Sequence, residues 1–343
     1  MHLRALRCCQ SIALAELYNM GKNLTGDGRL DLASTSVALL ANAASGRDDT
    51  AAQVEEIRAQ LEPHVGSFRH YPLRKGSEIA SVAQQAVKDG AGLIATLGGD
   101  GTQSAVAGAL AGSDTAMAVL PGGTFNYFSR GLGLGNDLSD ALEALVAGHV
   151  AWIDLGEVNG RIFLNNASFG VYPDILERRE SIYHRWGRSR LMAYWSVLAS
   201  LLDLRHPMQL RVSASGETRD ITTPLAFAAR SPYQLDSLGL EGADAVRDGH
   251  FALFIAQGHR RRDMMTAALR LAFGRAREGV DFELIIADDI VISGGRARRL
   301  VAFDGEKTHM AGPWHLKVRK DHLRVIVPPP ATAPPDSQKN ESQ

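Results

Sequence analysis

The stretch LIATLGGDGT, residues 93–102, decides the predicted fold. Residues 93–97 are a short apolar run, which predicts a buried β-strand. The glycines that follow remove side-chain bulk from a strand-to-helix turn, so backbone N–H groups and the N-terminus of the next helix can converge on an anion. We therefore expect a phosphate-binding turn at residues 98–102 and a nucleotide-using protein. Taken alone, the turn leaves open a purely structural role as a tight turn with an aspartate cap.

Two more apolar runs end in turns that are rich in glycine, amide and hydroxyl groups. In chain order the pattern is a strand at 37–41, a turn at 42–46, a helix at 54–61, an extended piece at 67–73, a helix at 79–87, the strand and turn at 93–102, a helix at 105–110, a strand at 116–120 and a turn at 121–126. Such alternation predicts a parallel sheet covered on both faces, with ligands at the carboxyl ends of its strands. The three turns are expected at that one edge.

The second half of the chain has a different texture. Asn159-Gly160 lies between two alternating apolar runs and predicts a two-residue hairpin. We expect a mainly antiparallel β-rich region with helical insertions. Its helices are expected near 173–184 and 190–204, and its later strands at 210–213, 251–256 and 323–327. The resulting division is a flexible leader at 1–35, an α/β nucleotide-binding domain at 36–149, a β-rich domain at 150–327 with the acceptor site and the general base, and a disordered proline-rich tail at 328–343.

Composition excludes several classes of protein. A length of 343 residues suggests two domains, and 37 Lys plus Arg against 38 Asp plus Glu gives no sign of nucleic-acid binding. The only cysteines, Cys8 and Cys9, cannot form a disulfide framework, so a cytoplasmic location is expected. No apolar run is long enough to span a bilayer. The roles of the leader and of this cysteine pair are not identified.

Asp100 is the chemically informative residue of the glycine turn. A carboxylate aimed at phosphates would repel them unless a cation intervenes, so we expect Asp100 to act through Mg²⁺ or a bound water. The sequence contains no Walker A pattern and no G-x-G-x-x-G after its first strand. A P-loop kinase and an ordinary Rossmann dehydrogenase are therefore disfavoured.

The ordered set of turns resembles the diacylglycerol kinase catalytic-domain family, which includes bacterial lipid kinases and sphingosine kinases. The resemblance covers about residues 36–327 and rests on NAASG at 42–46, GGDGT at 98–102, LPGGTFN at 120–126 and FDGE at 303–306. It implies a two-domain α/β fold of the lipid-kinase and NAD-kinase type, with the active site between a parallel-sheet nucleotide domain and a β-rich domain. It also implies ATP and Mg²⁺ as cofactors.

The same resemblance assigns roles to individual residues. Glu306 is expected to be the general base, with Asp100 as a rival base for which a metal or water-positioning role is preferred. A metal role is also given to Asp248, which begins an Asp-Gly pair that holds a structural Mg²⁺ in bacterial relatives. The residues expected to hold the nucleotide are Asn42, Ser45, Gly46, Gly98, Gly99, Asp100, Gly101, Thr102, Gly123, Thr124 and Asn126.

Four positions depart from the family pattern. Ala43 replaces a proline, Leu73 replaces a threonine, and Tyr127 replaces an aspartate after Asn126. Ala245 stands where a second carboxylate would support the Asp248 metal site, and Asp244 is the available substitute. The first three departures motivate the alternative of a catalytically weak nucleotide-binding module, which would bind ATP without turnover.

Two clusters mix cations with apolar residues. Residues 178–198 combine arginines, tyrosines and tryptophans with an apolar run, and residues 259–262 place His-Arg-Arg-Arg before a helix. Either can be a solvated basic face, but the family favours lipid contact for the first. The function of the second is undecided.

The sequence as a whole predicts an ATP-dependent lipid kinase that phosphorylates a hydroxyl of a diacylglycerol-like or sphingoid lipid. Its setting would be phospholipid biosynthesis, in the cytoplasm or at the inner membrane surface. The alternatives are an NAD kinase and a catalytically weak, membrane-associated nucleotide-binding module. No motif identifies the acceptor lipid or the oligomeric state.

Overall fold

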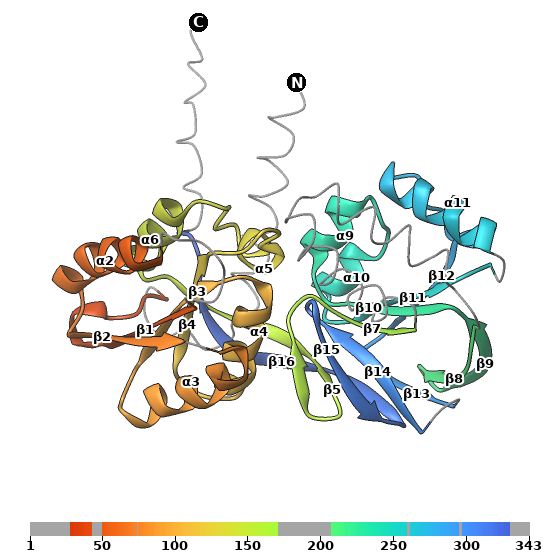
Figure 1. Ribbon diagram of the computed structural model, residues 1–343, viewed down its shortest axis with the longest axis horizontal. Coiled ribbons are helices and arrows are strands. Elements are labelled where there is room, and N and C mark those ends of the chain that lie inside the picture. Colours follow the sequence, from red (N-terminus) through yellow and green to blue (C-terminus); the bar gives the residue numbers. More distant parts are fainter. Residues whose placement is uncertain are drawn as a thin grey trace, which may run out of the picture.

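Two lobes make up the protein, and two long strands run through both of them (Figure 1). The computed structural model describes residues 28–42, 50–73, 75–170, 207–258, 261–294 and 297–329. The predicted helices near 173–184 and 190–204 lie outside these residues, as do most of the leader and of the tail.

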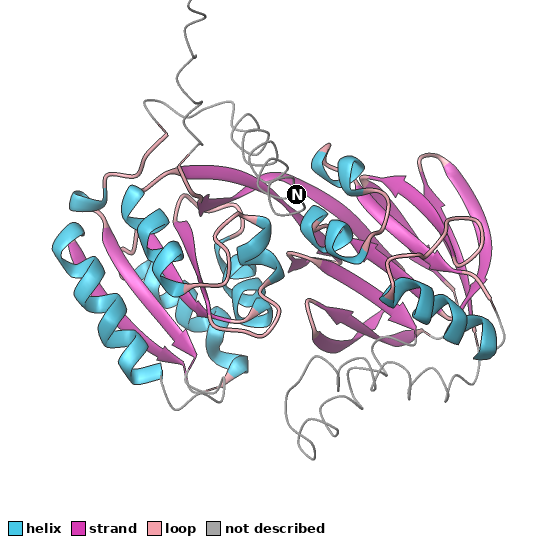
Figure 2. Ribbon diagram, turned by 90° about the horizontal axis from the view of Figure 1, so that it is seen from above, coloured by secondary structure: helices cyan, strands magenta, loops and turns pink. Residues whose placement is uncertain are grey.

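Four parallel strands form the centre of the first lobe, in the order β2-β1-β3-β4. They are β1 (Ser36–Asn42), β2 (Ser67–Leu73), β3 (Leu93–Gly98) and β4 (Ala116–Pro121). Every residue of β3 and β4 is buried, because helices cover both faces of these inner strands (Figure 2). The predicted parallel-sheet α/β domain is confirmed.

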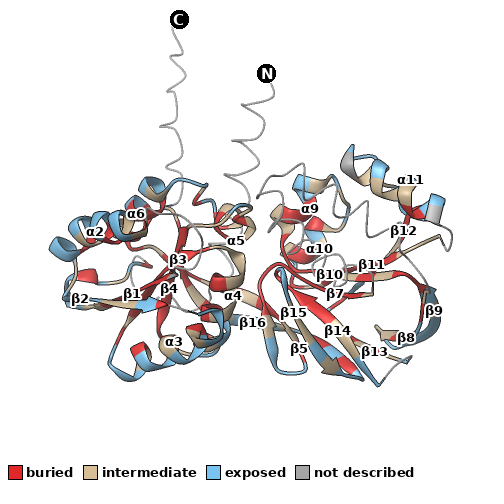
Figure 3. Cartoon of the chain, in the orientation of Figure 1, coloured by how far each residue is buried: buried red, intermediate tan, exposed pale blue. Residues whose placement is uncertain are grey.

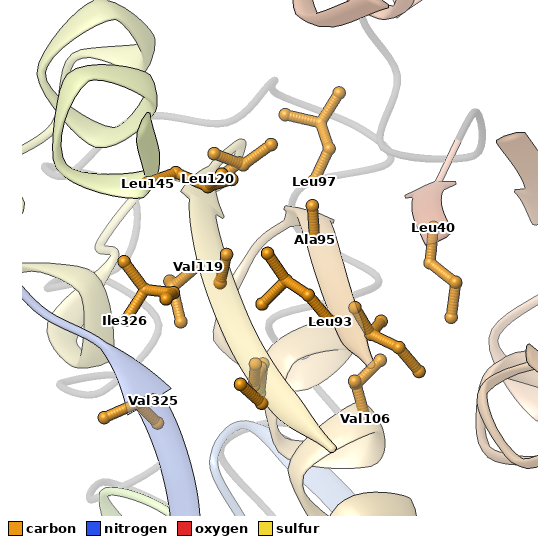
Figure 4. Packing of buried hydrophobic residues seen from close by; sticks show 14 of the residues in the cluster. Leu40, Leu93, Ala95, Leu97, Val106, Val119, Leu120, Leu145, Val325 and Ile326 are labelled. Carbon is orange, nitrogen blue, oxygen red and sulfur yellow. The ribbon is translucent and has the colours of Figure 1, made fainter. Parts of the chain in front are cut away.

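The helices of this lobe follow the strands in alternation. Helices α2 and α6 contact each other, as do α3 and α4, while α5 follows β4 directly. Their bounds are α2 (Thr50–Leu61), α3 (Ile79–Lys88), α4 (Asp100–Leu110), α5 (Tyr127–Gly131) and α6 (Leu138–Ala147), with 3-10 turns η1 (Leu32–Ser34), η3 (Glu62–His64) and η4 (Gly76–Glu78). Figure 4 shows the core between these elements, with Val106 of α4 and Leu145 of α6 beside the strand residues.

Residues 28–35 fall within the predicted leader but pack on the first lobe. Leu32 is buried in the first hydrophobic core, and the Leu30 N–H donates to the Gly148 carbonyl at 2.7 Å. The folded domain therefore includes this segment.

The second lobe consists of two sheets packed face to face. A six-stranded sheet has the order β12-β11-β10-β7-β14-β15, and it faces β8, β9 and β13, which continue the ten-stranded sheet of the first lobe. The strands are β7 (Asn166–Gly170), β8 (Met208–Ala214), β9 (Glu217–Thr223), β10 (Leu225–Ala229), β11 (Phe251–Ala256), β12 (Phe282–Ala287), β13 (Asp289–Ser293), β14 (Arg298–Phe303) and β15 (Glu306–Ala311). All pairings within the six-stranded sheet are antiparallel, which confirms the predicted β-rich region.

Helices α9 (Pro232–Leu238), α10 (Ala243–Arg247) and α11 (Arg261–Ala272) lie on one side of the six-stranded sheet (Figure 1). Beneath α9 and α10 is a small separate core that contains Leu235, Val246, Phe254 and Phe282. Figure 3 shows the buried strands of both lobes against the more exposed helices around them.

The lobes share the strands β5 (Val150–Val158) and β16 (Trp314–Ile326), which pair antiparallel with each other. Trp314 and Leu316 belong to the core of the second lobe, whereas Val325 and Ile326 belong to that of the first (Figure 4). The chain therefore returns to the first lobe at its end. The two positions of the predicted hairpin turn, between β5 and β6 (Arg161–Phe163), both have positive φ, as a two-residue turn requires.

Candidate active site

The turn at residues 98–102 joins the end of β3 to the beginning of α4. Gly99 is the N-cap of α4 in an extended conformation, and no side chain caps the helix there. The first N–H groups of an α-helix have no partner within the helix and carry the positive end of its dipole. The predicted strand-to-helix turn is therefore present, and its role in binding phosphate stays a prediction.

The second and third glycine turns touch each other at the carboxyl edge of the sheet. Gly98 lies opposite Pro121 in the parallel register, which continues through a Gly122 N–H to Gly98 C=O bond of 3.0 Å. A β-carbon added to Gly123 would lie 2.6 Å from the Gly99 α-carbon. Glycine is needed at these positions because the two backbones approach closely, independently of any phosphate binding.

Asn126 closes the third turn from inside. It is buried with φ 50° and ψ 44°, and its Oδ1 accepts the Gly123 N–H at 2.9 Å. Thr124 is exposed, whereas Thr102 is buried. Thr102 lies against Gly98, because a β-carbon added to Gly98 would lie 2.7 Å from the Thr102 β-carbon. Thr124 thus remains open to a ligand, and Asn126 and Thr102 hold the turns in shape.

Asp100 ties three parts of the protein together. Its Oδ1 accepts the Phe128 N–H at 3.0 Å from α5 and the Asn165 Nδ2–H at 3.4 Å from the second lobe. Burial raises the pKa of Asp100, and the hydrogen bonds from these partners oppose that rise. The carboxylate is therefore both an inter-lobe contact and a site at which burial favours the protonated form.

Asp304 is the buried anchor of the FDGE motif. Its carboxylate accepts backbone N–H groups from Leu164 at 2.7 Å and from Asn165 and Asn166 at 2.7 and 3.0 Å, and the Ser104 hydroxyl of α4 donates to it. Burial raises its pKa, against the effect of these donors. Asp304 and Gly305 both have positive φ and form the tight turn between β14 and β15. The turn is thereby fixed to the first lobe.

Glu306 follows this turn and faces the N-terminus of α4. A β-carbon added to Gly101 would lie 3.2 Å from Glu306 Oε1 and 3.5 Å from its Cγ. The Glu306 side chain is exposed, so water or a substrate can reach it. Residues from the two halves of the chain therefore meet where the phosphate-binding turn begins its helix.

The first turn is the least described part of the site. Asn42 ends β1 beside Leu73 of β2, and Ala41 pairs with Leu97 of β3. This places the end of β1 at the same edge as the other two turns. Ser45 and Gly46 lie outside the described residues, so their assignment stays a prediction.

The donor set near Asp100 fits a magnesium ion that arrives with phosphate. Within the described ranges, no three His, Cys, Asp or Glu side chains form a group that could hold a metal. Asp100 and Glu306 supply carboxylates, and Mg²⁺ is commonly bound by one or two carboxylates together with substrate phosphates. The two residues could complete such a site only with a bound nucleotide.

A carboxylate other than Asp244 lies beside the Asp248-Gly249 pair, since a β-carbon added to Gly249 would lie 3.2 Å from Asp154 Oδ2. Asp244 pairs with Arg247 at 2.6 Å. The Arg230 guanidinium donates to the Val246 carbonyl at 2.6 Å and to Asp154 at 2.8 Å, and both side chains of this ion pair are almost fully buried. Both nearby carboxylates already have an arginine partner, and the Asp248 metal site stays a prediction.

Comparison with known proteins gives a family match for the first lobe. Residues 36–158 match the family model described as "Diacylglycerol kinase catalytic domain". The predicted resemblance to this family is confirmed. The match includes the strand β1 and both described glycine turns, and it ends with β5.

Curated relatives carry the same family name. The diacylglycerol kinase of Staphylococcus aureus (strain bovine RF122 / ET3-1) is 28% identical over 222 residues, which is 64% of this chain and 70% of the relative. The diacylglycerol kinase of Staphylococcus aureus (strain JH9) matches to the same extent. The chain is thus similar to kinases of the diacylglycerol kinase family.

Solved structures support the fold. A crystal structure of a diacylglycerol kinase from Bacillus anthracis str. Sterne superposes with a TM-score of 0.64 at 19% identity, covering 87% of this chain and 98% of that one. A second structure from the same organism gives a TM-score of 0.69 at 18% identity and covers 88% and 99%. The two-lobe fold is therefore shared over nearly the whole of those chains.

Three residues of the site were not identified from the sequence. Asn165 contacts Asp100, Asp304 anchors the turn before Glu306, and Ser104 links that anchor to α4. Asp304 belongs to the FDGE motif, which is the signal in the sequence that points to a role for it. Asn165 and Ser104 carry no local pattern, since their partners are 65 and 200 positions away in the chain.

Proposed function

We propose that the protein is an ATP-dependent lipid kinase that transfers the γ-phosphoryl group of ATP to a hydroxyl of a diacylglycerol-like or sphingoid lipid. The observation that carries the proposal is the position of Glu306 over Gly101, at the N-terminus of α4, where the N-cap is Gly99. A helix end that can bind phosphate and an exposed carboxylate on the opposite lobe are two groups suited to phosphoryl transfer to an alcohol.

The phosphates of ATP would lie on the backbone N–H groups at the beginning of α4, near Gly98, Gly99 and Gly101, with the Gly123 and Thr124 turn beside them. Asn42, Ser45 and Gly46 would hold the rest of the nucleotide from the end of β1. The positive end of the α4 dipole lowers the energy of the negative charge that the phosphates bring.

Glu306 would accept the proton of the lipid hydroxyl as its oxygen attacks the γ-phosphorus. The bond from the γ-phosphorus to the bridging oxygen of ADP breaks as the new bond forms, so the products are the lipid phosphate, ADP and a protonated Glu306. A bound Mg²⁺ would neutralise phosphate charge. Asp100 would help to hold that ion or a water, and it also keeps α5 and Asn165 in place.

The acceptor has to come from a membrane, because long-chain lipids with a free hydroxyl reside there. We expect a cytoplasmic protein that works at the inner membrane surface, in phospholipid biosynthesis. In the part of the chain that the structure describes, helices fall short of the length and hydropathy needed to cross a bilayer.

The direct test is to incubate purified protein with Mg-ATP labelled in the γ-position and a panel of diacylglycerol, monoacylglycerol and sphingoid lipids in mixed micelles. A labelled lipid phosphate is the expected product. Folded protein that binds ATP but labels no lipid would refute the proposal and favour a nucleotide-binding module. Phosphorylation of NAD in the same assay would instead favour an NAD kinase.

A further inference from the structure

The exposed large hydrophobic side chains are concentrated in one segment. Across the described ranges, four large hydrophobic residues are strongly exposed, and all four lie between residues 269 and 286. Scattered single exposures are ordinary on a protein surface, whereas a cluster marks a surface that meets another apolar phase. The residues are Leu269 (51% exposed), Phe273 (75%), Val280 (51%) and Ile286 (36%).

Leu269 in α11 and Phe273 in the turn after it lie on one face. The Phe273 N–H donates to the Leu269 carbonyl at 3.1 Å, so the two residues are one helical turn apart, in line with Thr266 and Arg262, which are also exposed. Met264 on another face of the helix is buried. The helix is therefore held to the lobe by one face and directs an apolar end with an aromatic ring outward.

Cations surround this apolar end. The segment from Arg261 to Val280 contains five arginines against two acidic residues, Asp263 and Glu278, although the whole chain has a formal net charge of −1. Arg262, Arg275 and Arg277 are exposed, while Arg270 is used in an ion pair with Asp281 at 2.8 Å. A positive rim around apolar side chains complements a surface that is negatively charged outside and apolar within.

The position of α11 relates this surface to the site. It lies on the same side of the six-stranded sheet as α9 (Figure 1). Helix α9 packs on α5, with the Arg130 guanidinium 4.9 Å from the centre of the Tyr233 ring. Helix α5 in turn supplies the Phe128 N–H that binds Asp100. The turn after α11 also approaches the turn after α9, since a β-carbon added to Gly239 would lie 3.3 Å from the Gly274 α-carbon. Helix α9 therefore lies between the exposed segment and α5.

We propose that residues 261–280, which we call the α11 patch, dock the protein on an anionic phospholipid bilayer. Leu269 and Phe273 enter the interface between headgroups and acyl chains, and Arg275 and Arg277 contact lipid phosphates. The inference rests on the proposed function, since a lipid kinase takes its acceptor from a bilayer. It assigns that contact to a particular surface.

Sedimentation with phosphatidylcholine vesicles that contain phosphatidylglycerol tests the docking surface without any kinase reaction. The substitutions L269S and F273S are each expected to weaken vesicle binding roughly tenfold, because they remove the apolar part of the contact. The substitutions R275Q and R277Q are each expected to weaken it roughly fivefold, and only for vesicles with phosphatidylglycerol. Lys88→Gln removes an exposed cation of α3 on the first lobe; it is the control and should bind as the wild type does.

Because the substituted side chains are exposed, all variants should melt at the wild-type temperature, which excludes misfolding as the cause. Vesicle binding that is unchanged in L269S and F273S would overturn the docking surface. So would a dimer of the wild type that these substitutions dissociate, since the patch would then bind a second copy. If vesicle binding follows the prediction but no lipid is phosphorylated, the docking surface is supported and the proposed kinase function is refuted.

Discussion

Replacing Gly101 by alanine separates the catalytic arrangement from the stability of the fold. Gly101 lies in the first turn of α4, so alanine should stabilise the helix by about 0.5–1 kcal/mol through its higher helix propensity. The added β-carbon would lie 3.2 Å from Glu306 Oε1, closer than ordinary van der Waals contact. Because Glu306 is exposed, its carboxylate can move away by a few tenths of an ångström, and it then leaves the position for accepting the lipid proton.

A small displacement of this kind is costly for catalysis. A shift of about 1 Å in a catalytic group can reduce a rate about 100-fold, so a partial shift should lower kcat about tenfold. Stability would be measured by urea denaturation, and kcat with γ-labelled ATP and the preferred lipid. The expected result for G101A is an unfolding free energy equal to or above that of the wild type, together with the lower kcat.

Gly108 provides the matched control because it is an exposed glycine in the same helix. A β-carbon there would lie 3.6 Å from the Ile162 β-carbon, which is an ordinary contact. G108A should gain stability and keep its kcat. The reasoning fails if G101A is as active as G108A, or if G101A lowers the rate by the same factor when Glu306 is already glutamine, since the loss would then not pass through Glu306.

Three further predictions follow from the buried carboxylates. Asp304→Asn places an amide N–H₂ group against the backbone N–H donors of Leu164–Asn166, so donors lose acceptors. The free energy of unfolding in urea should fall by about 1–3 kcal/mol. A wild-type value would contradict the anchoring role of Asp304. Arg230→Met leaves Asp154 buried without its charge partner and should lower the free energy of unfolding in urea by about 3–5 kcal/mol. A decrease below about 1 kcal/mol would contradict this, because the pair would then behave like a surface ion pair. Burial raises the pKa of Asp100, so between the ordinary and the raised pKa the folded state binds more protons than the unfolded state. The contribution of Asp100 to the free energy of unfolding therefore falls as pH rises through that window. Asp100→Asn should flatten the pH dependence of the unfolding free energy there, and an unchanged slope would refute the shift.

The central strands and turns could be predicted from the sequence because their physical signals are local. Residues 93–97 and 116–120 are continuous apolar runs, as strands buried on both faces must be, and glycines mark the turns that follow. The contact between those turns, at Gly99 and Gly123, joins residues far apart in sequence and leaves no local trace.

The second lobe was harder to predict. Only residues 323–327 were expected as the last strand, but β16 begins at Trp314, since its charged positions alternate outward while Trp314 and Leu316 fill the core. The anchoring of Asp304 and the contact between Asn165 and Asp100 depend on how the lobes meet, which no periodicity encodes. The placement of Glu306 at α4 was inferred from the family resemblance alone.

The most direct test of the central claim is the rate of lipid phosphorylation by Glu306→Gln at saturating Mg-ATP, with the Kd for ATP measured in parallel. If Glu306 accepts the lipid proton, kcat should fall by about 10²–10⁴-fold while ATP binding and melting temperature stay at their wild-type values. A variant that keeps the wild-type kcat would contradict the claim, as would one whose loss of rate is matched by an equal loss of ATP affinity.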